Sequence, residues 1–144
     1  MRNIYVNNIQ VVVEAEVNPT ENLEKVKKAI INIFPTASID VRLGGRKSLL
    51  VATTEGIHGL SEFYGSLRQE RILAAARRVF RRGTQGNYIT FYLNKQVAYA
   101  QHISFCNSFG ESPLGPIQVK VRCDDPREVI DWLTKVISRN KKTR

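Results

Sequence analysis

The 144-residue sequence predicts an α+β fold, with a mainly antiparallel mixed sheet and helices packed on one side. Two observations predict this class. Stretches of alternating apolar and polar residues, typical of strands, are interspersed with stretches whose apolar residues recur every three or four positions, typical of helices. The resulting order, β-α-β-β-α-α-β-β-β-α, lacks the regular strand–helix alternation of a parallel sheet. We expect one domain over residues 1–138 and a basic C-terminal tail over residues 139–144.

The first strand and the first helix have clear local signals. Alternation over Ile9–Val17 predicts a strand with one buried face. Asn18 is the expected N-cap of the helix that follows, and Pro19 is suited to its first position. The apolar stripe from Leu23 to Phe34 is helical, and Pro35 ends it.

The middle of the chain is predicted to contain two short strands and a pair of helices. The strands cover residues 38–43 and 48–54, on either side of a turn at Gly44–Gly45. A short helix over residues 56–65 is expected to lead into a longer, continuous helix over residues 66–82.

The last third of the chain is predicted to contain a hairpin, a loop, a strand and a final helix. Residues 87–93 and 96–105 are expected to pair around a turn at Asn94–Lys95. A loop over residues 107–116 precedes a strand over residues 117–123. The final helix has an acidic cap, Asp125, followed by proline at the first helical position.

The charge balance indicates an anionic partner. Lysine and arginine number 22 against 13 acidic residues, a formal net charge of +9. Such an excess favours nucleic acid or a membrane surface as partner. The sequence contains no signal-like segment and no apolar run of about 20 residues that could span a membrane, so we expect a cytoplasmic protein.

The predicted long helix concentrates this charge. On a continuous helix, Arg68, Arg71, Arg78 and Arg82 fall within an arc of about 80°. Arg77 and Arg81 flank that arc, and Glu70 is the one carboxylate between residues 68 and 82. Guanidinium groups suit phosphate because their planar fork donates paired hydrogen bonds. The alternative is a solvated helix face, or ion pairs with Glu14, Glu16, Glu62 or Asp40.

Two tyrosines extend the candidate nucleic-acid site. Tyr88 and Tyr92 share one face of the predicted strand over residues 87–93 and are candidates for stacking on unpaired bases. The alternative is that they pack within the fold or at an interface. The RNP1 pattern of an RNA-recognition motif is absent.

The sequence gives little support for a catalytic site or a metal site. The two histidines, His58 and His102, lack metal-ligand spacing with the two cysteines, Cys106 and Cys123. A Cys106–His102 dyad would span about 13 Å along a strand, too far for contact. No phosphate-loop or nucleophile-elbow motif occurs. We expect no catalytic residue, metal, cofactor or small-molecule substrate, unless the loop over residues 107–116 forms a polar cleft.

Five stretches together resemble an archaeal family of uncharacterised proteins often described as RNA-binding-protein-like. They are Asn18-Pro19-Thr20-Glu21 before Lys25-Val26-Lys27-Lys28-Ala29, then Arg71-Ile72-Leu73-Ala74-Ala75-Ala76-Arg77, Ile89-Thr90-Phe91-Tyr92-Leu93-Asn94-Lys95-Gln96, Glu111-Ser112-Pro113-Leu114-Gly115-Pro116-Ile117 and Asp124-Asp125-Pro126. The resemblance covers about Gln10 to Leu133. It implies a fold similar to the large-subunit ribosomal protein that binds five-S rRNA, and it implies homodimers. It implies no activity and no catalytic residue.

Two functions remain open from the sequence. The first is a non-enzymatic protein associated with RNA or another nucleic acid through the arginine-rich helix face. The second is a homodimeric scaffold or protein-interaction module that does not bind nucleic acid, with the aromatic hairpin pairing across a two-fold axis. The loop Ser112-Pro113-Leu114-Gly115-Pro116 has a constrained backbone that would position a ligand, close a dimer contact or turn the chain.

Overall fold

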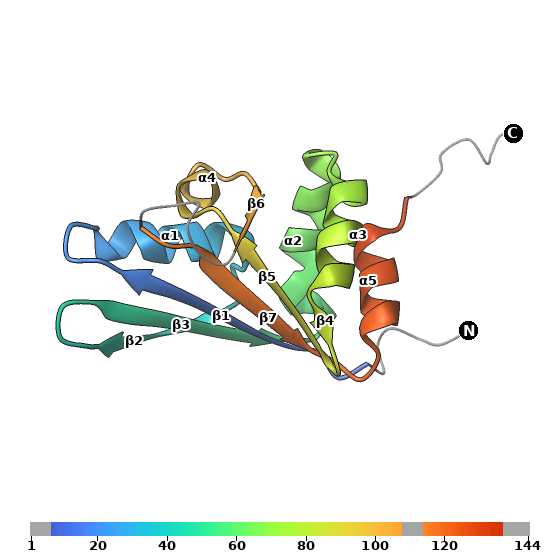
Figure 1. Ribbon diagram of the computed structural model, residues 1–144, viewed down its shortest axis with the longest axis horizontal. Coiled ribbons are helices and arrows are strands. Elements are labelled where there is room, and N and C mark those ends of the chain that lie inside the picture. Colours follow the sequence, from blue (N-terminus) through green and yellow to red (C-terminus); the bar gives the residue numbers. More distant parts are fainter. Residues whose placement is uncertain (1–6, 108–113, 137–144) are drawn as a thin grey trace, which may run out of the picture.

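One antiparallel sheet carries all the described helices on a single face (Figure 1). The computed structural model describes residues 7–107 and 114–136. The seven strands are β1 (Gln10–Val17), β2 (Ser38–Leu43), β3 (Ser48–Glu55), β4 (Thr84–Gln85), β5 (Tyr88–Leu93), β6 (Phe105–Cys106) and β7 (Ile117–Arg122). The helices are α1 (Leu23–Ile33), α2 (Gly56–Gln69), α3 (Leu73–Arg82), α4 (Lys95–Tyr99) and α5 (Pro126–Thr134). The predicted α+β class is confirmed.

The sheet order is β2-β3-β1-β7-β5-β4, with β6 also paired to β5. The central strand β1 shows the predicted alternation, because Val11, Val13 and Ala15 are buried while Val12 and Glu14 are half-buried. Its buried residues face the helices. None of the described helices lies on the opposite face of the sheet (Figure 1), which we call the open face.

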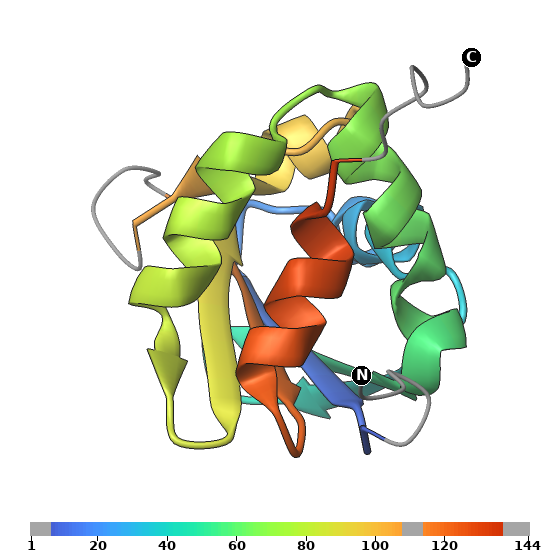
Figure 2. The ribbon, with the colours of Figure 1, turned by 90° about the vertical axis from the view of Figure 1, so that its right-hand side faces the viewer.

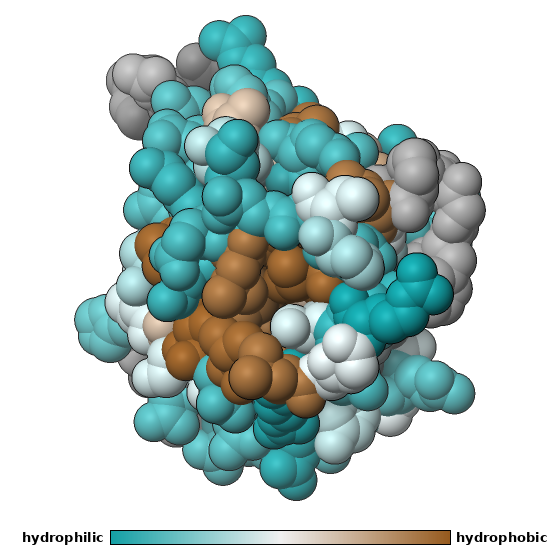
Figure 3. Space-filling view, turned by 90° about the vertical axis from the view of Figure 1, so that its left-hand side faces the viewer, coloured by the Kyte–Doolittle hydropathy of each residue, from teal (hydrophilic) through white to brown (hydrophobic). Residues whose placement is uncertain are grey.

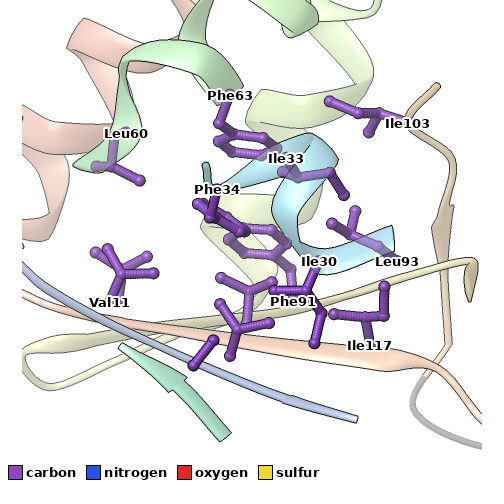
Figure 4. Close-up of a cluster of buried hydrophobic side chains, with 14 of the residues drawn as sticks. Val11, Ile30, Ile33, Phe34, Leu60, Phe63, Phe91, Leu93, Ile103 and Ile117 are labelled. Atoms are coloured by element: carbon purple, nitrogen blue, oxygen red, sulfur yellow. The ribbon is translucent and has the colours of Figure 1, made fainter. Parts of the chain in front are cut away.

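An aromatic cluster fills the space between sheet and helices. Phe63 of α2 stacks on Phe91 of β5, with ring centroids 5.5 Å apart, and Phe80 of α3 lies 4.9 Å from Phe91. Phe34, at the end of α1, lies 5.6 Å from Phe63. Figure 4 shows Phe34, Phe63 and Phe91 between α1, α2 and the sheet, with aliphatic side chains around them. Helices α2 and α3 are thereby anchored on β5, and the end of α1 is anchored on α2.

Helix α1 begins later than predicted. Its N-cap is Asn22, whose side chain accepts from the backbone amides of Glu24 and Lys25. Asn18 is not the cap. Its side-chain amide instead donates to Glu21 Oε1 (2.8 Å) and to the carbonyl of Leu114 (2.9 Å). Asn22 also offers a capping side chain, and the polar contacts of Asn18 hold the preceding turn outside the helix.

The predicted continuous helix over residues 66–82 is wrong. Helix α2 continues to Gln69, and Arg71 then adopts a left-handed backbone with φ of 59° before α3 begins at Leu73. A straight helix from Gly56 to Arg82 would be about 40 Å long. The break allows apolar residues of both helices to bury against one core, which a straight rod of that length would prevent.

The second arm of the predicted hairpin is also wrong. Asn94 caps helix α4 by accepting from the amide of Val97, 2.9 Å away. In place of the predicted second arm, only the two-residue strand β6 pairs with β5, opposite Tyr92 and Leu93. Lys95, which was expected in an exposed turn, is buried and forms an ion pair with Glu21. This buried ion pair favours the helix α4 over a turn.

The last strand and helix match the prediction. Strand β7 lies between β1 and β5, and Asp125 caps α5 by accepting from the amide of Glu128. No helix in the described ranges is long and apolar enough to cross a membrane. The expected basic tail and the residues Ser112 and Pro113 of the constrained loop lie outside the described residues.

Candidate nucleic-acid interface

Helices α3 and α5 together form a cationic surface. They pack side by side, with α5 between α3 and α2 (Figure 2). Ala76 and Phe80 anchor α3 in the core, so Arg78 and Arg82 extend from its opposite, exposed side. Arg77 and Arg81 extend toward α5. With Arg127 of α5, these four arginines define what we name the α3–α5 surface.

An open groove of about 530 Å³ separates the two helices within this surface. Its lining residues are Arg81, Thr84, Arg127, Ile130 and Asp131. Asp131 accepts from Arg77, whose Nη1 lies 3.1 Å from Oδ1. This partner was not among the carboxylates considered from the sequence. Among the described residues that line the groove, Asp131 is the one carboxylate, and the guanidinium groups of Arg81 and Arg127 outnumber it.

Arg68 does not belong to this surface. It lies on α2, where its guanidinium donates to the carbonyls of Tyr64 (3.1 Å), Leu133 (3.0 Å) and Lys135 (2.6 Å). It also lies 3.5 Å from the centroid of the Tyr64 ring. The guanidinium of Arg68, which was predicted to bind phosphate, therefore joins α2 to the C-terminal end of α5.

Arg71 is exposed but separate from the other arginines. It occupies the link between α2 and α3, at the N-terminal end of α3, whereas Arg82 ends that helix. A ten-residue helix is about 15 Å long. The single arc predicted for Arg68, Arg71, Arg78 and Arg82 therefore does not exist, because the helix on which it was drawn is broken.

The two candidate tyrosines lie on the open face of the sheet. Tyr88 is 42% exposed and Tyr92 is half-buried. On the neighbouring strand β7, Arg122 is opposite Tyr88, and Lys120 lies with its Nζ 5.5 Å from the Tyr88 ring centroid. Aromatic rings and cations thus alternate across two adjacent strands.

The predicted site residues therefore occupy two faces. The arginines of α3 lie in the helix layer, and Tyr88 and Tyr92 lie beneath the sheet. Strand β4 connects the two, since the chain passes from Arg82 through β4 to Tyr88 in six residues. No pattern in the sequence pointed to Arg127, because only the packing of α5 beside α3 brings it to the groove.

The histidine and cysteine side chains that the structure describes do not gather into a metal site. Burial, with the carboxylates of Asp125 and Asp124, raises the pKa of Cys123 to about 11, so this thiol stays protonated at neutral pH. His102 Nδ1 lies 2.7 Å from Glu70 Oε2, and the side chain of His102 is exposed. No group of three His, Cys, Asp or Glu side chains in these ranges could hold a metal ion.

Residues 10–123 match a family described as RNA binding. A UPF0201 protein of Metallosphaera sedula is 44% identical over 132 residues, which cover 92% of each chain. A UPF0201 protein of Aeropyrum pernix is 42% identical over 126 residues, 87% of this chain and 84% of the relative. The matched region contains α3, the groove residue Thr84 and both tyrosines, but ends before Arg127.

Solved structures share the fold. A crystal structure of a UPF0201 protein from Methanococcus jannaschii superposes with a TM-score of 0.79 at 34% identity, covering 87% of this chain and 98% of the other. A DUF54 protein from Methanothermobacter thermautotrophicus gives a TM-score of 0.67 at 20% identity, covering 89% and 99%. The second likeness concerns the fold alone.

Proposed function

The chain belongs to the family described as RNA binding and is related to the archaeal UPF0201 proteins, and from this premise we propose that it binds RNA through the α3–α5 surface. The observation that carries the proposal is the groove in which Arg81 and Arg127 flank a single lining carboxylate. Phosphate oxygens accept paired hydrogen bonds from guanidinium groups. Exposed arginines that lack enough acidic neighbours are suited to that role.

In this proposal, α3 and α5 contribute binding affinity but do not select the base sequence. Phosphate contacts position a nucleic acid but carry no sequence information. The bases would instead reach Tyr88 and Tyr92 on the open sheet face, where stacking suits single-stranded RNA. A single-stranded RNA that passes over β4 would contact both the α3–α5 surface and the open face of the sheet. Lys120 and Arg122 would hold its backbone beside the tyrosines.

Charge reversal on α3 tests the proposal. Binding of a labelled single-stranded RNA is measured by fluorescence anisotropy at several salt concentrations. For Arg78→Glu/Arg82→Glu we expect about tenfold weaker binding or more at low salt. Losing two phosphate contacts should also reduce the slope of log affinity against log salt by about 1.4.

A variant with the same change in net charge provides the control. Lys28→Glu/Arg46→Glu alters two exposed cations on α1 and the β2–β3 turn, away from α3. We expect its affinity to remain within about threefold of the parent, as for general charge effects alone. Equal losses for the two double variants would overturn the α3–α5 surface as the binding site. Absence of RNA binding by the parent chain would overturn the function itself.

We also infer that the chain forms a homodimer. The observation that favours self-association is Leu43, which is 84% exposed at the end of the outermost strand β2. This second property is compatible with RNA binding and equally with a scaffold that binds no nucleic acid. That the chain is a non-enzymatic, cytoplasmic protein, and that its fold is like that of the five-S-rRNA-binding ribosomal protein, remain predictions.

A further inference from the structure

We propose that two copies of the chain pair through their β2 strands, antiparallel and with Val41 opposite its own counterpart, to form one continuous sheet. This interface rests on the homodimer proposed above and is independent of RNA binding. The proposal follows from three properties of β2: an unprotected edge, an uncovered apolar face and a self-complementary charge pattern.

Strand β2 leaves one long edge of the sheet open. All six of its residues pair with β3 in an unbroken register from Ser38–Thr53 to Leu43–Ser48, and β2 has no second neighbour among the described strands. Long edges of this kind are usually blocked by proline, bulges or inward-pointing charges. β2 has none of these. The other edge of the sheet is interrupted, because β4 and β6 are two residues each.

The face of β2 that points toward the helix layer is apolar and incompletely covered. Ile39 and Val41 are half-buried and Leu43 is 84% exposed, although their neighbours on β3, Ala52 and Leu50, are buried. Figure 3 views the end of the molecule where β2 turns into β3 and shows a broad, hollowed apolar area there. Single exposed apolar residues are ordinary. Three in succession on one face of an edge strand, two of them half-buried and one exposed, favour a partner.

The sequence of β2 is complementary to itself when the strand is reversed. With Val41 on the two-fold axis, Asp40 of one copy is opposite Arg42 of the other, and Ile39 is opposite Leu43. Opposite charges stabilise such cross-strand pairs. In the single chain Asp40 and Arg42 form only an exposed pair, with Arg42 Nε 3.6 Å from Asp40 Oδ2.

Neighbouring registers lose this complementarity. A two-fold axis at Asp40 places the two Asp40 carboxylates opposite each other, and an axis at Arg42 does the same for the two guanidinium groups. An axis between two residues places charged side chains on the apolar face. The register centred on Val41 therefore combines apolar contact on one face with alternating charges on the other, and both helix layers lie on the same side of the joined sheet.

A charge swap tests this register. The molar mass of the full chain is measured by light scattering over a range of micromolar concentrations. We expect a dimer for the parent chain and a dissociation constant raised about tenfold or more for Asp40→Arg and for Arg42→Asp, since each creates two like-charge contacts. The double variant Asp40→Arg/Arg42→Asp restores opposite charges and should recover the dimer.

Leu43→Lys tests the apolar face and should also produce monomers, while its exposed position leaves the single chain folded. Val136→Lys is the matched control, because Val136 is 72% exposed beyond α5, and it should leave the mass unchanged. Circular dichroism verifies that each variant is folded. A monomeric parent would overturn both the homodimer and this interface. A dimer retained by all β2 variants would overturn the interface alone, and failure of the double variant to recover would overturn the register.

Discussion

The guanidinium of Arg68 donates a hydrogen bond to the backbone carbonyl of Leu133 across 3.0 Å, so an arginine of α2 closes the C-terminal end of α5. Carbonyls at the end of a helix have no intrahelical donor, and a positive charge there interacts favourably with the helix dipole. Tyr64 lies against the same guanidinium and stacks on Trp132 with ring centroids 4.8 Å apart. These contacts join α5 to α2, on the side of α5 that faces away from α3 and the groove.

We predict that Arg68→Ala lowers the free energy of unfolding by about 2–3 kcal/mol, because hydrogen bonds to three carbonyls are lost. Arg68→Lys should recover only part of this, since a single ammonium cannot reproduce the planar fork. Urea denaturation measures both values. Arg82→Ala, an exposed arginine on α3, should remain within about 0.5 kcal/mol of the parent. Equal effects at the two arginines would contradict the structural role of Arg68.

The buried ion pair of Lys95 and Glu21 gives a second stability prediction. Lys95 is 3% exposed, and its Nζ donates to Glu21 Oε1 (3.1 Å) and to the carbonyls of Glu16 and Leu114. Lys95→Met leaves a buried carboxylate without its cation and should cost about 3–5 kcal/mol. Adding Glu21→Gln removes that charge and should recover part of the loss. Both are measured by chemical denaturation.

Lys28→Met is the control for Lys95, because Lys28 is an exposed lysine on α1. Its stability should stay within about 0.5 kcal/mol of the parent. A double variant that is less stable than Lys95→Met would show that the carboxylate of Glu21 is not the source of the penalty.

The buried thiol of Cys123 should be inert in the native protein. Its pKa is raised to about 11, mainly by burial and then by Asp125 and Asp124, and thiolate is the reactive form. In a Cys106→Ser background, a thiol reagent at pH 8 should label Cys123 only after denaturation. Rapid labelling of the folded chain would contradict the burial of this side chain.

The raised pKa of Cys123 also makes the free energy of unfolding depend on pH. From pH 9 to about 11 the unfolded chain releases the thiol proton while the folded chain retains it, so folding becomes less favourable as pH rises. Below pH 9 both states hold the proton and the effect is absent. Cys123→Ala removes this dependence, and the stability of the parent relative to this variant should therefore decrease between pH 9 and 11 in denaturation experiments.

The close approach of α3 to β5 depends on Gly83. A Cβ at this position would meet the backbone carbonyl of Thr90, whose amide donates to Gly83 at 2.9 Å. Gly83→Ala should therefore destabilise the protein by about 1–3 kcal/mol, because the backbone must shift. Gly45→Ala is the comparison, since a Cβ at residue 45 has no neighbour within 4 Å. Similar melting temperatures for the two variants would refute the predicted clash.

Local patterns predicted much of the fold correctly. Alternation located β1, β2, β5 and β7, because the side chains of a strand alternate between a buried and an open face, and a run of apolar residues located β3. Proline and an acidic cap located the start of α5. The errors occur at Asn18, at Arg71 and after Asn94. At each of these a local signal had two compatible outcomes, and long-range contacts decided between them.

The candidate site was less predictable than the fold. Its arginines were visible as a cluster, but the arc that joined Arg68 to Arg82 assumed one unbroken helix. The break at Arg71 assigns Arg68 to the interior of the helix layer and leaves Arg78 and Arg82 exposed. The partner of Arg77, Asp131, and the additional cation, Arg127, both come from α5 and lie some fifty residues away in sequence.

The sequence by itself determined the class of fold, the positive charge and its concentration over residues 68–82, because these follow from composition and from periodicity within single elements. Tertiary structure decided which cations face solvent and which are bound inside, which acids neutralise them, and which strand forms the open edge. Those outcomes depend on contacts between residues far apart in the chain, and the local spacing of side chains contains no information about such contacts.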